Sequence, residues 1–322
     1  MRQSEYSIRI GLVNNMPDAA LEATEQQFAG LLGAAAEDMP VQLSLFALPG
    51  VPRSEEGKRR IDGLYCSTDT LGEAAVDALI VTGAEPLCPN LKDEPYWNGF
   101  ARLVDWAEEN TYSAIWSCLA AHAAVLHTDG IPRQRLSEKL FGVFESETVA
   151  EHYLTSGLPG RHWMPHSRWN GIAEEALTAR GYRILTRAED AGVDTFIRKG
   201  QSQFVFFQGH PEYEAATLLR EYRRDIRRFL RRETEAYPAA PRAYFDENCA
   251  ALLAGMKRKA HLNREEEALA DFPSGALAST LSNSWRSSAV SVYRNWLSYL
   301  SAQKYQRLRA PYVAEAALRE SA

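Results

Sequence analysis

The chain has 322 residues, of which 45% are hydrophobic and 24% are charged. A chain of this length and composition can bury one substantial core, which excludes a disordered or fibrous protein. The 42 acidic residues outnumber the 36 basic ones, and the formal charge of −6 gives no reason to expect a general affinity for nucleic acid. No stretch approaches the roughly 20 consecutive apolar residues of a membrane-spanning helix, so we expect a protein that neither enters a membrane nor is exported.

The first 130 residues alternate between apolar runs and amphipathic segments. The runs predict strands at residues 8–17, 41–48, 78–84 and 113–117, and the segments between and after them predict helices at 21–32, 96–110 and 119–125. Unbroken apolar strands that alternate with helices are typical of a parallel, doubly wound α/β sheet. In such sheets, functional sites lie at the carboxyl ends of the strands.

The pattern changes after Ile131. Short alternating segments as far as Arg198 predict antiparallel strands added to the same domain. We expect a long charged helix over residues 215–234, a loop over 271–284 and a closing helix over 288–306. The whole chain, 1–322, is therefore interpreted as one domain, with a core at 8–300 and a C-terminal tail at 301–322.

Cys118 stands where an apolar strand runs directly into an alanine-rich helix. A cysteine at such a junction lies on a sharp turn at a helix N-terminus, where the positive end of the dipole favours the thiolate. Cysteines are often simply buried, but a second apolar strand ends in Gly209-His210-Pro211-Glu212 and supplies a base and a carboxylate. Cys118, His210 and Glu212 are therefore predicted to be a nucleophile, its general base and the group that orients the base.

The other cysteines, Cys66, Cys88 and Cys249, form neither a C-x-x-C pair nor a zinc-ligand pattern with Cys118. They are too few and too scattered for a disulfide framework. We therefore expect reduced thiols, a cytoplasmic protein and no metal site.

Further segments, in combination with these, resemble one known family. They are Asn15-Met16-Pro17, Val81-Thr82-Gly83-Ala84, Glu138-Lys139-Leu140, Pro165-His166-Ser167-Arg168, Gly209-His210-Pro211-Glu212-Tyr213 and Ser284-Trp285-Arg286-Ser287. From about Ile8 to Tyr299 the chain resembles the homoserine O-succinyltransferases of methionine biosynthesis. That resemblance implies a flavodoxin-like core shared with class I glutamine amidotransferases, and a homodimer.

The resemblance also implies roles for individual residues. Cys118 would take the acyl group from an acyl-CoA co-substrate as a thioester, His210 would be the base and Glu212 would orient it, with no bound cofactor. The backbone N–H groups of Leu119 and of Gly83 or its neighbour would stabilise the oxyanion. The positions that match the family's homoserine-binding residues are Lys139, Ser167 and Arg224.

The chain departs from the family pattern in two loops. Asp18-Ala19-Ala20 follows Asn15-Met16-Pro17, where the family usually carries lysines. In the loop after Gly83, relatives have Gly with succinyl-CoA and Glu with acetyl-CoA, and a count without gaps places Leu87 at that position. Leu87 fills space without carrying charge, so it identifies neither donor.

The sequence therefore predicts ping-pong transfer of an acyl group, with succinyl favoured, to homoserine. Three alternatives stay open: acetyl transfer to homoserine or to serine, glutamine amide hydrolysis, and a non-catalytic scaffold. The segment Trp116-Ser117-Cys118-Leu119-Ala120 lacks the Gly-x-Cys-x-Gly form usual in amidotransferases. The presence of all three predicted catalytic residues argues against a scaffold.

Overall fold

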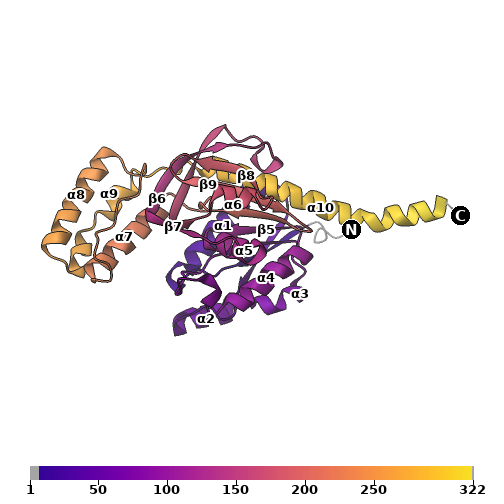
Figure 1. The fold of residues 1–322 in the computed structure, drawn as a ribbon, viewed down its shortest axis with the longest axis horizontal. Helices are drawn as coiled ribbons and strands as arrows, with labels where there is room; N and C mark the ends of the chain where they lie inside the picture. Colours follow the sequence, from indigo (N-terminus) through magenta and orange to yellow (C-terminus); the bar gives the residue numbers. More distant parts are fainter. Residues whose placement is uncertain (1–6, 321–322) are drawn as a thin grey trace.

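The computed structural model describes residues 7–320, with side chains as far as residue 309. Within these residues a ten-stranded sheet has the order β3-β2-β1-β4-β5-β10-β9-β8-β6-β7 (Figure 1). The strands are β1 (Ile8–Val13), β2 (Val41–Ala47), β3 (Cys66–Ser67), β4 (Ala78–Thr82), β5 (Ser113–Ser117), β6 (Gln134–Thr148), β7 (Arg161–Gly171), β8 (Arg183–Ala188), β9 (Gly192–Lys199) and β10 (Gln203–Phe207). The helices are α1 (Leu21–Ala36), α2 (Glu55–Leu64), α3 (Leu71–Ala74), α4 (Trp97–Asn110), α5 (Leu119–Asp129), α6 (Glu174–Thr178), α7 (Thr217–Leu230), α8 (Glu247–Leu262), α9 (Ser274–Ala278) and α10 (Arg286–Glu320).

The first half of the sheet is parallel and covered on both faces. Strands β3, β2, β1, β4, β5 and β10 are joined by parallel pairings. Side chains alternate between two cores: Leu79 and Val81 of β4 pack in the core that includes α4 and α5, and Ala78 and Ile80 pack in the core that includes α1 and α10. This alternation explains why β4 is apolar at every position but its last. The predicted doubly wound α/β fold is confirmed.

The second half of the sheet is antiparallel, as the change of pattern after Ile131 predicts. Strand β10 pairs with β9, β9 with β8, β8 with β6 and β6 with β7, each in the antiparallel sense. The register between β6 and β7 shifts between Arg135 and Leu140. Such an irregularity re-aims the side chains beside it, and Lys139 lies within the shifted segment.

A small helical lobe packs on β6. Helices α7, α8 and α9 bury their apolar side chains with Phe141 and Val143 of that strand, and Figure 1 shows them grouped at one side of the sheet. Helix α9 lies in the segment that we expected to be a loop. The serines and alanines of this segment show no helical spacing of large apolar residues. The helix is instead stabilised by burial of Leu277 in the lobe.

Helix α10 closes the other face of the sheet and extends past it (Figure 1). Trp296 is fully buried against the sheet, where its Nε1 donates a hydrogen bond of 2.9 Å to Ser113 Oγ. Farther along, Lys304 Nζ lies 2.7 Å from Asp77 Oδ2, and both side chains are over nine-tenths buried. None of the described helices is both long and apolar enough to cross a bilayer.

Removal of one partner of the buried Lys304 and Asp77 pair should destabilise the protein. Lys304→Met removes the cation and leaves a buried carboxylate, so the free energy of unfolding should fall by about 3 kcal/mol. Lys259→Met is the matched control, because its pair with Asp271 is 3.2 Å long and about two-thirds exposed, and it should cost under about 0.5 kcal/mol. Urea unfolding measures both. Equal losses in the two variants would contradict this account.

Candidate active site

Three neighbouring parallel strands end side by side. Thr82 of β4, Ser117 of β5 and Phe207 of β10 are partners in register. Gly83 directly follows β4, and Cys118 directly follows β5. His210 is the third residue after β10. The predicted placement of these residues at one edge of the sheet is therefore confirmed.

Cys118 occupies a strained turn between β5 and α5. Its φ of +50° and ψ of −109° are rare for a residue with a side chain. Its N–H donates to the carbonyl of Phe207 at 2.7 Å, and its own carbonyl accepts from the N–H of Ala121 at 3.0 Å. These bonds hold the turn from both sides and present the partly exposed sulfur at the start of the helix. This is the geometry of a nucleophile on a strand-to-helix turn.

His210 is held in one orientation. Its Nδ1 lies 2.8 Å from Glu212 Oε1, and both side chains are almost fully buried. Its backbone N–H donates to the carbonyl of Pro165 at 2.9 Å. With Nδ1 engaged by the carboxylate, Nε2 is the nitrogen that faces Cys118, as a general base requires.

The electrostatics at His210 favour the charged ring. Burial lowers the pKa of His210, but the negative charges of Cys118 and Glu212, and hydrogen bonds to both, raise it well above its usual range. The site therefore favours a protonated His210 ring beside Cys118.

Gly83 lies against the first turn of α5. A Cβ at Gly83 would lie 2.4 Å from Leu119 Cβ and 2.9 Å from the backbone nitrogen of Ala120, so only glycine fits. This contact brings the two segments predicted to form the oxyanion hole together.

The three predicted substrate-binding residues also meet, on one face of α7. Lys139 Nζ donates to Asp225 Oδ2 at 2.7 Å, and Arg224 lies 2.9 Å from Asp225 Oδ1. Ser167 donates to Glu221 Oε2, which lies 3.7 Å from Lys139 and 3.5 Å from Arg224. Two cations, a hydroxyl and two carboxylates thus form one polar cluster.

Sequence reasoning missed the acidic half of this cluster. Glu221 and Asp225 are three residues before and one after Arg224 on α7. The available signal was a pair of carboxylates four residues apart, which share a helix face, inside an arginine-rich segment. Tyr213, which donates to Glu221 Oε1 at 2.5 Å, was also missed.

A buried arginine near the nucleophile was missed as well. Arg168 comes from the same motif as Ser167, and its Nη1 donates to the carbonyl of Asn170 at 2.6 Å. Burial lowers the pKa of Arg168, while the negative charges of Cys118 and Asp194 act to raise it. Arg168 thus adds positive potential close to the thiol.

Leu87 lies on the loop between β4 and α4 and is 68% exposed. Two residues earlier, Glu85 lies 3.1 Å from Arg228 of α7, one turn beyond Arg224. The loop therefore reaches the helix that carries the polar cluster, and the role of Leu87 in donor choice stays a prediction.

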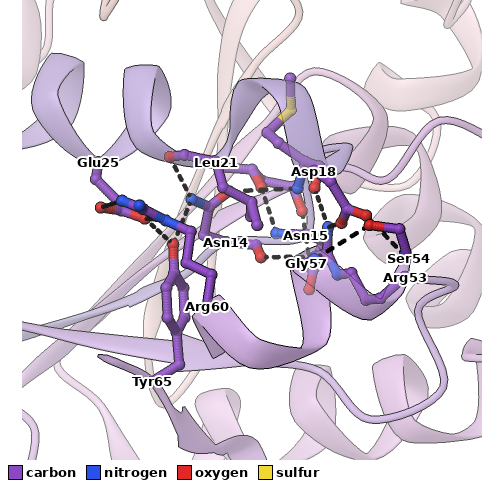
Figure 2. A network of polar contacts seen from close by, with 12 residues as sticks. Asn14, Asn15, Asp18, Leu21, Glu25, Arg53, Ser54, Gly57, Arg60 and Tyr65 are labelled. Carbon is purple, nitrogen blue, oxygen red and sulfur yellow. Dashed lines mark hydrogen bonds and ion pairs between the residues drawn. The ribbon is translucent and has the colours of Figure 1, made fainter. Parts of the chain in front are cut away.

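The loop after β1 lies beside the end of β4, next to Gly83. It is the loop in which Asp18-Ala19-Ala20 stands where the family usually carries lysines. Asn15 is bound to β4, since its N–H donates to Thr82 Oγ1 at 2.8 Å and its Nδ2 to the Thr82 carbonyl at 2.9 Å. Figure 2 shows how Arg53 holds the same loop, with bonds of 3.2 Å to Asp18 Oδ1 and to the carbonyl of Asn14. Asp18 therefore has a structural role here.

Comparison with known proteins places the chain among acyltransferases by sequence. The model of a family described as homoserine O-succinyltransferase matches residues 1–307. A homoserine O-succinyltransferase of Rhodopseudomonas palustris is 51% identical over 92% of this chain and 89% of its own length. One of Bradyrhizobium japonicum is 46% identical over 91% of this chain and 90% of its own length.

Solved structures agree on the fold. A glutamine amidotransferase of Thermotoga maritima has a TM-score of 0.51 and 13% identity, over 91% of this chain and 98% of that chain. One from Methylobacillus flagellatus has a TM-score of 0.50 and 12% identity, over 91% of this chain and 95% of that chain. Identities this low establish a shared fold and nothing about the reaction.

The pairing of Cys118 with His210 can be tested by alkylation with iodoacetamide. An imidazolium favours the thiolate at low pH, so His210→Asn should lower the Cys118 alkylation rate at pH 6 about tenfold or more. Glu212→Gln should lower the alkylation rate less. Cys118, the other negative charge that favours the imidazolium, remains in this variant. Peptide mapping separates Cys118 from exposed Cys66.

The matched control is His127→Asn, because His127 pairs with Asp105 away from the strand ends. It should leave the rate and its pH dependence unchanged. An unchanged pH profile in His210→Asn would show that His210 does not act on Cys118.

Proposed function

The chain belongs to the homoserine O-succinyltransferase family, and from that premise we propose that it is an enzyme that transfers a succinyl group from succinyl-CoA to the hydroxyl of homoserine. The observation that carries this proposal is the strained turn that presents Cys118 beside His210, whose ring is held by Glu212. Family membership supplies the substrates, and this geometry supports the route.

In the first half-reaction the Cys118 thiolate attacks the thioester carbonyl of succinyl-CoA. A new C–S bond forms and the carbonyl becomes an oxyanion, which the N–H groups of Leu119 and of Gly83 or its neighbour would stabilise. Collapse of this intermediate breaks the bond to CoA. The proton on His210 Nε2 goes to the departing CoA thiolate. The product is a succinyl thioester on Cys118, of similar energy to the donor.

In the second half-reaction homoserine occupies the polar cluster and its hydroxyl replaces CoA at the thioester. His210, now neutral, takes the hydroxyl proton as the oxygen attacks, and returns it to the sulfur of Cys118 as the C–S bond breaks. Glu212 keeps the same tautomer and ring orientation through both steps.

The polar cluster matches the two charged ends of an amino acid. Arg224 is about half exposed, so it has donors free for the carboxylate of homoserine, and Lys139 lies on the other side of Asp225. Glu221 accepts from Ser167 and can accept equally from an ammonium group. The cluster would thus bind the carboxylate, the ammonium group and the polar end of the side chain.

Other features of the proposal follow from the chemistry and the family. A thioester is already activated, so the route uses acyl-CoA as co-substrate and needs neither a metal nor a resident cofactor. We propose a cytoplasmic homodimer that acts on small molecules and on neither nucleic acid nor membranes. Acetyl transfer, to homoserine or to serine, is the second candidate, because Leu87 does not match the glycine expected with succinyl-CoA. The third candidate is hydrolysis of the glutamine amide, because the chain shares its fold with glutamine amidotransferases.

Intact-mass spectrometry after separate incubation with succinyl-CoA, acetyl-CoA and glutamine should distinguish these candidates. Succinyl-CoA should add one succinyl group, which homoserine then removes, and Cys118→Ala should abolish both the adduct and turnover. Cys249→Ala is the matched control, because that thiol is buried in the helical lobe. A succinyl adduct on Cys118→Ala would contradict the assignment of the nucleophile, and ammonia release from glutamine would favour the hydrolase.

The role of Leu87 is tested by two substitutions. If Leu87 narrows the acyl pocket, Leu87→Gly should raise kcat/KM for succinyl-CoA relative to acetyl-CoA, and Leu87→Glu should lower this ratio by repelling the succinyl carboxylate. Changes of this kind are worth about 10-fold to 200-fold in specificity. Leu64→Glu, also exposed but on α2, should leave the ratio unchanged. If the Leu87 variants also leave it unchanged, this side chain does not select the donor.

A further inference from the structure

Tyr213 contacts both the general base and the polar cluster. Its ring stacks on the imidazole of His210, with centroids 4.2 Å apart and planes inclined by 17°. Its hydroxyl donates to Glu221 Oε1 at 2.5 Å, while Glu221 Oε2 accepts from Ser167. One side chain therefore links the catalytic ring to a carboxylate of the cluster proposed to bind homoserine.

Tyr213 is itself held in place by a distant part of the chain. Its carbonyl accepts hydrogen bonds from Trp285 Nε1 at 2.8 Å and from Asn283 Nδ2 at 3.3 Å. Trp285 is almost fully buried in the helical lobe. The position of the Tyr213 ring is thus fixed independently of His210, so the ring can act as a wall against which the imidazole rests.

The phenol of Tyr213 acts as a donor. Burial, followed by the negative charges of Glu221 and Glu212, raises the pKa of Tyr213 well above its usual range. The hydroxyl therefore keeps its proton and its bond to Glu221. In the cluster, Glu221 is also close to Lys139 and Arg224, which are the groups that an incoming amino acid would engage.

We propose that Tyr213 is a positioning residue with two separable effects: its ring fixes the plane of His210, and its hydroxyl ties Glu221, and with it the bound amino acid, to that ring. The proposal rests on the proposed function for its substrates. The ring acts in both half-reactions, because His210 works in both. The hydroxyl acts when homoserine is bound, so it matters for the second half-reaction.

Two substitutions separate the effects. Tyr213→Phe keeps the stacked ring and removes one hydrogen bond, so acylation of Cys118 should stay within about twofold, while transfer to homoserine should slow about tenfold. Tyr213→Leu removes the ring as well, so acylation should also slow, by about 10-fold to 100-fold, because the base is no longer held at the sulfur. Single-turnover release of CoA measures acylation, and loss of the succinyl adduct on adding homoserine measures transfer.

Tyr222 supplies the matched controls. It is a buried tyrosine of α7 whose ring packs in the helical lobe. Tyr222→Phe and Tyr222→Leu should therefore change both half-reactions equally or not at all, as a loss of stability alone would. Reaction of Cys118 with iodoacetamide, which needs no acyl-CoA, should be slowed by Tyr213→Leu and restored in Tyr213→Phe.

The possible outcomes are distinct. Selective slowing of transfer in Tyr213→Phe supports the proposal, and equal slowing of both half-reactions, or of neither, overturns it. If Tyr213→Leu does not fold, Tyr213→Phe still decides. If the unsubstituted protein takes no acyl group from any acyl-CoA, the proposed function fails, and the iodoacetamide rates then test the effect of the ring alone.

Discussion

The register of three parallel strands is the constraint on which the rest of the site depends. Because Thr82, Ser117 and Phe207 are aligned, the turns that follow β4, β5 and β10 emerge at one point. The hydrogen bond from the N–H of Cys118 to the carbonyl of Phe207 then joins two of these turns directly. A slip of one residue in either pairing would reverse the faces of the side chains and separate the nucleophile from its base.

The antiparallel half of the sheet and the helical lobe supply the polar cluster of the candidate site. Strands β6 and β7 bring Lys139 and Ser167 toward α7, and the carbonyl of Pro165 in β7 accepts from the N–H of His210. The helical lobe positions α7 against β6 through Phe141 and Val143. In the proposed function, the residues that follow the parallel strands perform the covalent chemistry. The residues of β6, β7 and α7 bind the amino acid.

The sequence predicts the parts of the site that depend on local pattern. Cys118 and His210 follow apolar strands, so periodicity alone places them at strand ends. Lys139, Ser167 and Arg224 were identified through family resemblance, and their meeting depends on packing between β6, β7 and α7 that no local pattern encodes. Glu221 and Tyr213 were missed because their partners are distant in sequence or supplied by another element. Helix α9 was missed because Leu277 is its one large apolar residue. The contacts that bury Leu277 come from the helical lobe and are not encoded in the local sequence.

The hydrogen bond between Trp285 and the carbonyl of Tyr213 bears on the order in which the site is completed during synthesis. Cys118 is synthesised first, and His210 and Glu212 follow it. The indole that holds the tyrosine beside the base is added only at residue 285, after every strand of the described sheet. A nascent chain thus contains the nucleophile and its base before Tyr213 is held by Trp285, so we expect full activity only after residue 285 has been added.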